Sequence, residues 1–294
     1  MSEHFADIAK KENVRHVLGL SGGKDSAALA VYIKNHYPEI HSKMEYFFSD
    51  TGAELPEVYE FLDKMEAYLG KEINRLASGE DFEHWLKVHN DYLPSVRQRW
   101  CTRVMKIKPF VDFVKGTAAI SYIGIRADEF REGLNTGVGK KPNYYTIENV
   151  DAVYPFIDDG LVRDDVFQIL EDSVGIPEYY KWRSRSGCYF CFFQRQDEWL
   201  GLKRNHPELY EKAKAFEGRS RKKWQYGEGL IAVGDGEYTW STQGSLDELV
   251  AKAEKAEKEG KTFKSKQYKR WQDALRYNEE DEDPEDQSCL ICSL

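Results

Sequence analysis

The stretch Val17–Ser26, with the sequence VLGLSGGKDS, decides the fold because an apolar run leads directly into a glycine-rich turn. The run up to Leu20 predicts a buried strand, and Ala27–Ile33 predicts the start of a helix. Gly22 and Gly23 let the backbone turn sharply and bring N–H groups close to an anion. The following helix directs its positive N-terminal end at the same point. The stretch therefore predicts an anion-binding strand–turn–helix unit.

The side chains of this turn suit a phosphate chain. Ser21 and Ser26 add hydroxyl donors, Lys24 adds a positive charge, and Asp25 is a candidate Mg²⁺ ligand. The common nucleotide-binding pattern G-x-x-x-x-G-K-[ST] is absent. An ordinary strand–helix turn is the alternative interpretation.

Length and composition indicate a folded protein with room for one large domain and an appendage, since the chain has 294 residues, 41% of them hydrophobic. It has no run of eighteen apolar residues, and Met1–Asn13 has no signal-peptide core, so we expect a cytoplasmic protein without a membrane segment. The net charge of −9 argues against a general nucleic-acid binder. Two basic clusters depart from that average: Lys181, Arg183, Arg185 and Arg195, and then Arg219, Arg221, Lys222 and Lys223.

Strand-like and helical segments alternate over residues 1–217. The expected strands are 14–20, 44–49, 73–76 and 118–125, and the expected helices are 24–35, 57–69, 81–88, 106–115 and 162–173. The alternation predicts an α/β fold, with a parallel sheet and helices on both of its faces. Ligands of such sheets bind beyond the carboxyl ends of the strands. Three loops are expected there: 21–26, 49–54 and 126–131.

Residues 218–294 are expected to form a mainly helical appendage to this domain. A glycine-rich, β-like stretch covers 226–240, and a capping box at Ser245–Glu248 predicts a helix that reaches about Glu259. A second helix is expected over 265–277. An acidic run at 279–286 and a terminal C-x-x-C follow it.

Several motifs, in consistent order, resemble those of the phosphoadenosine-phosphosulfate reductase family and of the ATP pyrophosphatases, whose loop reads S-G-G-K-D-S. The segments that carry the resemblance are SGGKDS (21–26), SDTG (49–52), PEVY (56–59), IGIRADE (123–129) with Arg131, YPFI (154–157) and DV (165–166). Together they cover about residues 14–217. The resemblance implies an adenine-nucleotide α-hydrolase fold with a sheet of about five parallel strands.

The resemblance also implies site residues for ATP and Mg²⁺. Those expected to bind nucleotide are Leu20, Ser21, Gly22, Gly23, Lys24, Asp25, Ser26, Ser49, Asp50, Thr51, Gly52, Gly124 and Arg126. Those expected to take part in catalysis are Lys24, Asp25, Asp50, Arg126 and Glu129. Those expected to bind substrate are Arg131, Arg183 and Arg185.

Physical roles can be given to two of these residues. Asp50, at the end of a strand, is placed to bind Mg²⁺ or a ribose hydroxyl, and Arg126 to offset charge on the α-phosphate as pyrophosphate leaves. The alternatives are a turn-initiating residue for Asp50 and a surface salt bridge between Arg126 and Glu129.

Five cysteines in a cytoplasmic protein favour metal ligands or redox groups over structural disulfides. The resemblance to iron–sulfur adenylylsulfate reductases implies that Cys101, Cys188 and Cys191 hold a [4Fe–4S] cluster. Cys289 or Cys292 would be the fourth ligand, unless the fourth iron stays open and carries a sulfide. The alternatives are Zn²⁺ held by the two C-x-x-C pairs, and a metal-free arrangement with a core cysteine and a redox pair.

The expected function is that of an ATP pyrophosphatase that adenylates a substrate for sulfur transfer. The segment after Cys191 resembles a subgroup that includes the ATP pyrophosphatase of DNA phosphorothioation, often encoded beside phage-defence functions. This implies a cysteine desulfurase as sulfur donor, other DNA-modification subunits, and DNA reached through such a complex. The terminal Glu-Cys-Gly-(Ile/Leu)-His nucleophile of simple reductases is missing. A thiol-dependent reductase of phosphoadenosine or adenosine phosphosulfate and a non-catalytic nucleotide-sensing scaffold are the alternatives.

Overall fold

A five-stranded, all-parallel sheet forms the centre of the protein, as the sequence predicted. The computed structural model describes residues 13–95, 98–129, 147–184, 187–217, 224–226, 229–231 and 238–260. The strands lie in the order β3-β2-β1-β4-β5. Their bounds are β1 Arg15–Gly19, β2 Met44–Asp50, β3 Ile73–Ala77, β4 Ala119–Tyr122 and β5 Val150–Val153. The sequence analysis missed β5, a four-residue strand interrupted by Asp151 and therefore without a continuous apolar run.

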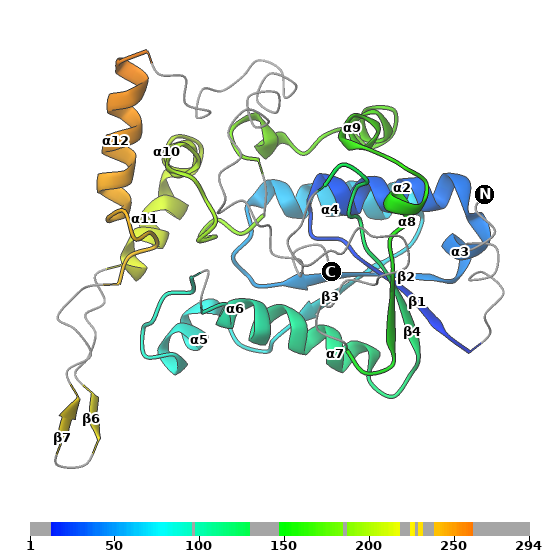
Figure 1. The fold of residues 1–294 in the computed structure, drawn as a ribbon, viewed down its shortest axis with the longest axis horizontal. Helices are drawn as coiled ribbons and strands as arrows, with labels where there is room; N and C mark the ends of the chain where they lie inside the picture. The colour runs from blue at the N-terminus through cyan, green and yellow to red at the C-terminus, as the bar shows by residue number, and fades with distance from the viewer. Residues whose placement is uncertain are drawn as a thin grey trace.

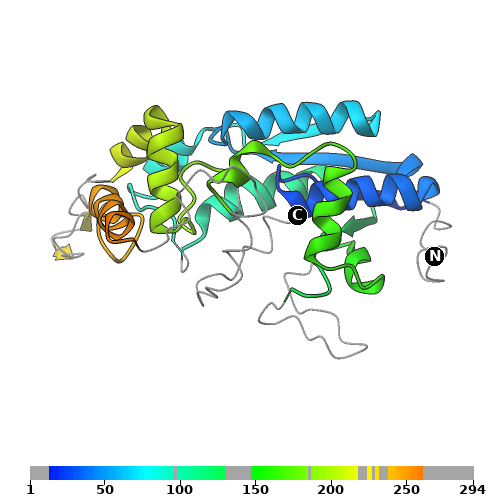
Figure 2. The ribbon, with the colours of Figure 1, turned by 90° about the horizontal axis from the view of Figure 1, so that it is seen from above.

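Helices cover both faces of the sheet, which confirms the predicted α/β architecture (Figures 1 and 2). Above the sheet in Figure 1 lie α2 (Lys24–His36), α4 (Pro56–Leu69), α8 (Pro155–Asp158) and α9 (Arg163–Glu171). Below it lie α6 (Trp100–Thr102) and α7 (Lys108–Val114). Two further helices, α3 (Pro38–Lys43) and α5 (Phe82–Val88), connect neighbouring elements.

Alternate residues of the central strands pack into two different apolar cores, because successive side chains of a strand point to opposite faces. Val17 belongs to the core between the sheet and α7, where Phe47 stacks on Phe110 with ring centroids 4.8 Å apart. Leu18 and Tyr46 belong to the larger core on the opposite face. The carboxyl ends of β1, β2 and β4 are thereby held at one edge of the sheet.

The helical segment expected over 106–115 begins inside a π-helical turn, η1 (Arg103–Ile107), which joins α6 to α7. Pro109 has no N–H to donate to the carbonyl of Met105, so a regular α-helix cannot be completed there. The N–H of Lys108 instead bonds to the carbonyl of Arg103, five residues back. Such wide turns change the direction in which the following side chains point.

Three helices gather at one end of the molecule, on the left of Figure 1: α10 (Gln196–Asn205), α11 (Pro207–Phe216) and α12 (Leu246–Lys258). Arg204 of α10 forms an ion pair with Glu257 of α12 at 2.7 Å. The predicted capping box of α12 is present. No helix among the described residues is long and apolar enough to cross a membrane.

The chain between α11 and α12 includes β6 (Trp224–Tyr226) and β7 (Gly229–Ile231), which pair antiparallel. Only β7 lies within the stretch 226–240 that was expected to be β-like, and β6 ends where that stretch begins. The helix expected over 265–277, the acidic run and the terminal C-x-x-C lie outside the described residues.

Candidate nucleotide and cysteine sites

The predicted phosphate loop lies between β1 and α2, at the carboxyl edge of the sheet. Leu20 extends the strand ladder into the loop, because its N–H bonds to the carbonyl of Phe47 at 2.7 Å. Within the loop, the Ser21 N–H and the Ser21 hydroxyl both lie 3.3 Å from the hydroxyl oxygen of Ser26. Gly22 has φ +75°. The loop is thus closed by its own serines.

Charged side chains from two strand ends meet beside this loop. Asp25 accepts a bond from Lys24 Nζ at 2.6 Å and another from Arg126 Nη1 at 2.8 Å. Arg126 also bonds through Nε to Asp128 at 3.0 Å, and Glu129 lies 4.0 Å from its Nη1. The structure therefore brings together four of the five residues expected to act in catalysis.

Burial and charge act in opposite directions on this cluster. Burial disfavours the ionised Asp25, but the charges of Lys24 and Arg126 hold the pKa of its carboxyl well below the ordinary value. Burial lowers the pKa of Lys24, although Asp25 opposes that shift. The Arg126 side chain is 14% exposed, which is less than a surface salt bridge would show. Asp25 thus acts here as the counter-ion of two cations.

Two further predicted residues, Gly124 and Asp50, lie just after β4 and at the end of β2. A Cβ atom on Gly124, just after β4, would lie 2.9 Å from the carbonyl oxygen of Asp25, so a side chain there would push the Arg126 loop away from α2. At the end of β2, Asp50 Oδ1 accepts bonds from the Gly52 N–H at 2.8 Å and the Tyr59 hydroxyl at 2.9 Å. The bond to Gly52 is the one that a turn-initiating aspartate makes.

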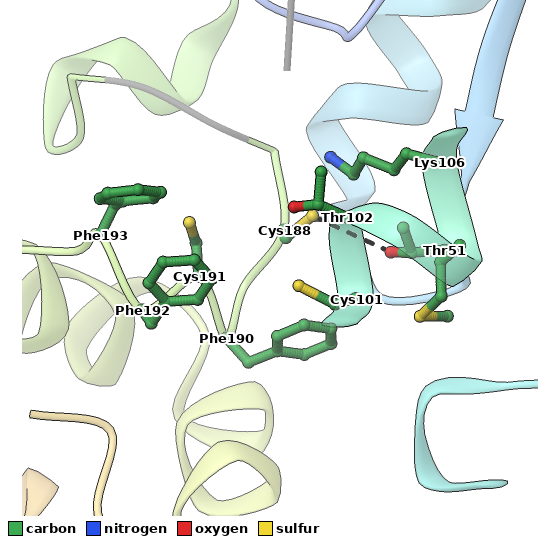
Figure 3. A pocket seen from close by; sticks show the side chains of 10 residues that line it. Thr51, Cys101, Thr102, Lys106, Cys188, Phe190, Cys191, Phe192 and Phe193 are labelled. Atoms are coloured by element: carbon green, nitrogen blue, oxygen red, sulfur yellow. Dashed lines mark hydrogen bonds between the residues drawn. The ribbon is translucent and has the colours of Figure 1, made fainter. Parts of the chain in front are cut away.

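Three of the predicted metal ligands line one cavity of about 30 Å³. Cys101 comes from α6, and Cys188 and Cys191 come from the loop after the 3₁₀ turn η2 (Glu178–Lys181) (Figure 3). The wall is completed by Thr51, Thr102, Met105, Lys106, Phe190, Phe192 and Phe193. In the described part of the chain, no three His, Cys, Asp or Glu side chains lie close enough to hold a metal ion. Cys289 and Cys292 lie outside that part.

The thiols are nevertheless donors of the type that a soft metal takes, although in this arrangement they are not gathered around one point. Three thiols surround one largely apolar space, which suits iron or zinc once the thiols are deprotonated. Lys106 lines the same cavity from η1 and would favour their charged form.

Cys188 is the most enclosed of these thiols, at 7% exposure. Its Sγ donates to Glu54 Oε1 at 3.2 Å, and Glu54 also accepts from the Thr51 hydroxyl at 2.7 Å. Burial raises the pKa of the Cys188 thiol, Lys106 opposes that rise, and Glu54 adds to it. Burial also raises the pKa of Glu54. Cys188 is therefore held as a neutral thiol.

Glu54, Tyr59 and Lys106 were not among the predicted site residues. Glu54 and Tyr59 lie within or next to the D-T-G…P-E-x-Y motif, and an acidic residue between the apolar residues Ala53 and Leu55 was a usable signal. Lys106 lies in the K-I-K-P segment that follows Cys101. No sequence pattern indicated the π-helical turn that brings it into the cavity.

Arg183 is buried beside the cysteine loop, at 2% exposure. Its Nη2 donates to the carbonyl of Cys188 at 2.6 Å. Its Nε and Nη1 have no hydrogen-bond partner within the described part of the protein. A guanidinium stays charged at any ordinary pH, so these two buried donors suit an anionic ligand beside the cysteine loop. Arg131 and Arg185, the other expected substrate ligands, lie outside the described residues.

The nucleotide loop and the cysteine loop are adjacent, and Val58 of α4 lies between them. A Cβ atom on Gly22 would lie 2.5 Å from Val58 Cγ1, and one on Gly187 would lie 2.6 Å from Val58 Cγ2. Tyr59 makes a second connection, because its hydroxyl bonds to Asp50 at 2.9 Å and to Glu54 at 3.4 Å. The phosphate loop and the cysteine loop therefore share one wall, formed by Val58.

Residues 15–150 match the phosphoadenosine phosphosulfate reductase domain. This match includes the phosphate loop, Asp50, Cys101 and Arg126, and it ends before Cys188. It supports the resemblance seen in the motifs over that part of the chain.

Two uncharacterized proteins of Methanocaldococcus jannaschii are related to most of the chain. One is 27% identical over 223 residues, covering 74% of this chain and 44% of that protein. The other is 27% identical over 211 residues, covering 71% of this chain and 49% of that protein. The chain thus spans about half the length of these curated relatives.

Two solved structures are similar at 15% sequence identity. Phosphoadenylyl-sulfate reductase from Candida auris, in a phosphate complex, gives a TM-score of 0.46 and covers 64% of this chain and 87% of its own. The U34-tRNA thiolase NcsA from Methanococcus maripaludis, with its [4Fe-4S] cluster, gives 0.38 and covers 71% of this chain and 72% of its own.

We expect the three thiols to differ in reactivity. In metal-free protein at pH 8, Cys188 is expected to react with iodoacetamide on the order of tenfold more slowly than Cys101 or Cys191, because the thiolate is the nucleophile and burial disfavours it. Peptide mass spectrometry at several times measures each rate. In urea the three rates are expected to converge, whereas equal rates in the folded protein would contradict the arrangement around Glu54.

Proposed function

We propose that this chain is an ATP pyrophosphatase that adenylates a substrate for sulfur transfer. One observation carries the proposal: a phosphate loop with its own charged cluster packs against Val58, and so does the loop that carries Cys188 and Cys191, through Gly187. Each site alone suits several chemistries. Their contact favours a reaction in which activation by a nucleotide is followed by delivery of sulfur.

The loop residues would act on the phosphate chain of ATP–Mg²⁺. Backbone N–H groups of the loop and the N-terminus of α2 would bind the β- and γ-phosphates. A substrate atom would attack the α-phosphorus, the bond to the bridging oxygen would break, and pyrophosphate would leave with that electron pair. Lys24 and Arg126 would offset its charge, and Asp25 keeps both cations in place. Asp50 would bind a ribose hydroxyl or Mg²⁺.

The cysteine pocket would serve the sulfur-transfer step. Cys101, Cys188 and Cys191 would hold a [4Fe–4S] cluster, or alternatively Zn²⁺, with Cys289 or Cys292 as a candidate fourth ligand. A cluster held there would supply iron–sulfur chemistry for the transfer. The chain's own residues shape the pocket: Phe190, Phe192 and Phe193 exclude water from it. Arg183 fixes the carbonyl of Cys188 and is our candidate for binding the anionic substrate, together with Arg131 and Arg185.

We extend the proposal to DNA phosphorothioation as the biological setting, on the resemblance of the segment after Cys191. A cysteine desulfurase would supply sulfur in the cytoplasm, and other DNA-modification subunits would present DNA. In this scheme residues 1–217 form the nucleotide-binding domain with the cysteine site, and residues 218–294 form an appendage. The ion pair between α10 and α12 would fix part of that appendage to the domain.

A second candidate function is a thiol-dependent reductase of phosphoadenosine or adenosine phosphosulfate, which the domain match over 15–150 favours. The same loop would hold the sulfate or phosphate of such a substrate. This function requires sulfite release from activated sulfate and no pyrophosphate from ATP.

Product analysis separates the two functions. The anaerobically purified protein would be incubated with ATP–Mg²⁺, sulfide and duplex DNA, and in parallel with activated sulfate and a thiol. We expect pyrophosphate and AMP in the first reaction and no sulfite in the second. Sulfite without pyrophosphate would contradict the proposal and favour the reductase, and nucleotide binding without either product would favour a sensing scaffold.

Ser21→Ala and Asp25→Ala are each expected to reduce turnover by about 10²-fold or more, because each removes a group that orients or stabilises the phosphate chain. Circular dichroism would confirm that both variants fold. Asp63→Ala, on the exposed side of α4, is the matched control and should keep full turnover. If activity survives in both loop variants, the loop is not the site of the reaction.

A further inference from the structure

Two buried tyrosines from η2 lie against the phosphate loop, although they follow it by more than 150 residues. Tyr179 and Tyr180 are 0% and 2% exposed, and their rings stack with centroids 4.7 Å apart. The Tyr179 hydroxyl donates to the carbonyl of Gly22 at 3.0 Å. The N–H of Lys24 donates to the Tyr180 hydroxyl, also at 3.0 Å. The two tyrosines thus bond to peptide groups on either side of Gly23.

The bond from Tyr179 determines which way a whole peptide group faces. In a trans peptide the C=O and the N–H point in opposite directions, so holding the Gly22 carbonyl also fixes the direction of the Gly23 N–H. This peptide joins two glycines, and glycine restricts rotation least. Gly22 itself has φ +75°, one of several conformations open to it. Tyr179 therefore selects the orientation in which the Gly23 N–H points away from the tyrosines.

Tyr180 acts on the next peptide group. A Cβ atom on Gly23 would lie 3.5 Å from the Tyr180 hydroxyl and 3.3 Å from Ser21 Oγ, so these two hydroxyls flank Gly23. The Tyr180 oxygen accepts the Lys24 N–H, so it holds the peptide between Gly23 and Lys24 in one orientation, with that N–H turned toward the tyrosine.

Packing alone does not require these hydroxyls. Phenylalanine would fill the same volume in an apolar core, and a buried tyrosine needs a partner only because of its O–H. Here both partners are backbone groups of the one loop in the described chain that resembles a phosphate-binding loop.

We propose that Tyr179 and Tyr180 are positioning residues of the phosphate loop, which fix the two peptides on either side of Gly23 so that the Gly23 N–H is presented to the β- and γ-phosphates. This inference rests on the proposed nucleotide function. It adds two residues that contact the loop from behind and are distant from it in sequence.

The test compares Tyr179→Phe and Tyr180→Phe with the wild-type protein by isothermal titration calorimetry, using ATP–Mg²⁺, inorganic pyrophosphate and AMP. Loss of either hydroxyl leaves a loop peptide group without its partner, and we expect affinity for ATP and pyrophosphate to fall roughly tenfold. Affinity for AMP, which lacks the β- and γ-phosphates, should stay the same. A merely structural role would not separate these ligands.

Tyr210→Phe is the matched control. Tyr210 is 1% exposed and its hydroxyl donates to Asp247 at 3.0 Å, but it lies on α11. All affinities should be unchanged in this variant. Unchanged binding of ATP and pyrophosphate by both folded tyrosine variants would overturn the inference, and so would an equal loss for AMP. A wild-type protein that binds neither ATP nor pyrophosphate would overturn the proposed function as well.

Discussion

The packing of Val58 between Gly22 and Gly187 is the constraint on which the arrangement of both sites depends. Neither glycine has room for a Cβ atom, because the two methyl groups of Val58 already occupy that space. In a close-packed interior such a contact cannot be widened without moving one of the loops. The phosphate loop and the cysteine loop are therefore held at a fixed separation by one side chain of α4.

Buried polar groups hold the cysteine loop against this wall. Glu54 accepts bonds from Thr51, Tyr59 and Cys188, and its backbone forms an isolated bridge with Cys188. Arg183 bonds to the carbonyl of Cys188 from the other side. Buried polar groups are costly unless they are paired, so these contacts specify one position for the loop. The residues around the cysteines thus connect to Asp50 through Tyr59 and to the phosphate loop through Tyr179, whose carbonyl accepts the N–H of Arg183.

The sequence indicated local features well and long-range contacts poorly. The glycine turn after β1 and the alternation of strands and helices predicted the parallel sheet, because both follow from short-range periodicity. The same alternation predicted that the loops carrying Asp25 and Arg126 would lie at one edge of the sheet, since the ends of parallel strands share that edge; the ion pair between the two residues was not predicted. The contacts of Tyr179 and Glu54 depend on packing between segments far apart in sequence, and no spacing rule encodes them. The short strand β5 and the π-helical turn before α7 were missed because neither has a distinct periodic pattern.

The most direct test of the shared wall is a parallel measurement of ATP affinity and of the Cys188 alkylation rate in Val58→Ala. Removing the two methyl groups frees both loops, so we expect ATP to bind more weakly and Cys188 to react faster. Val250→Ala on α12 removes equally buried methyl groups far from both sites and should change neither quantity. A folded Val58→Ala protein in which only one quantity changes, or neither, would contradict the account.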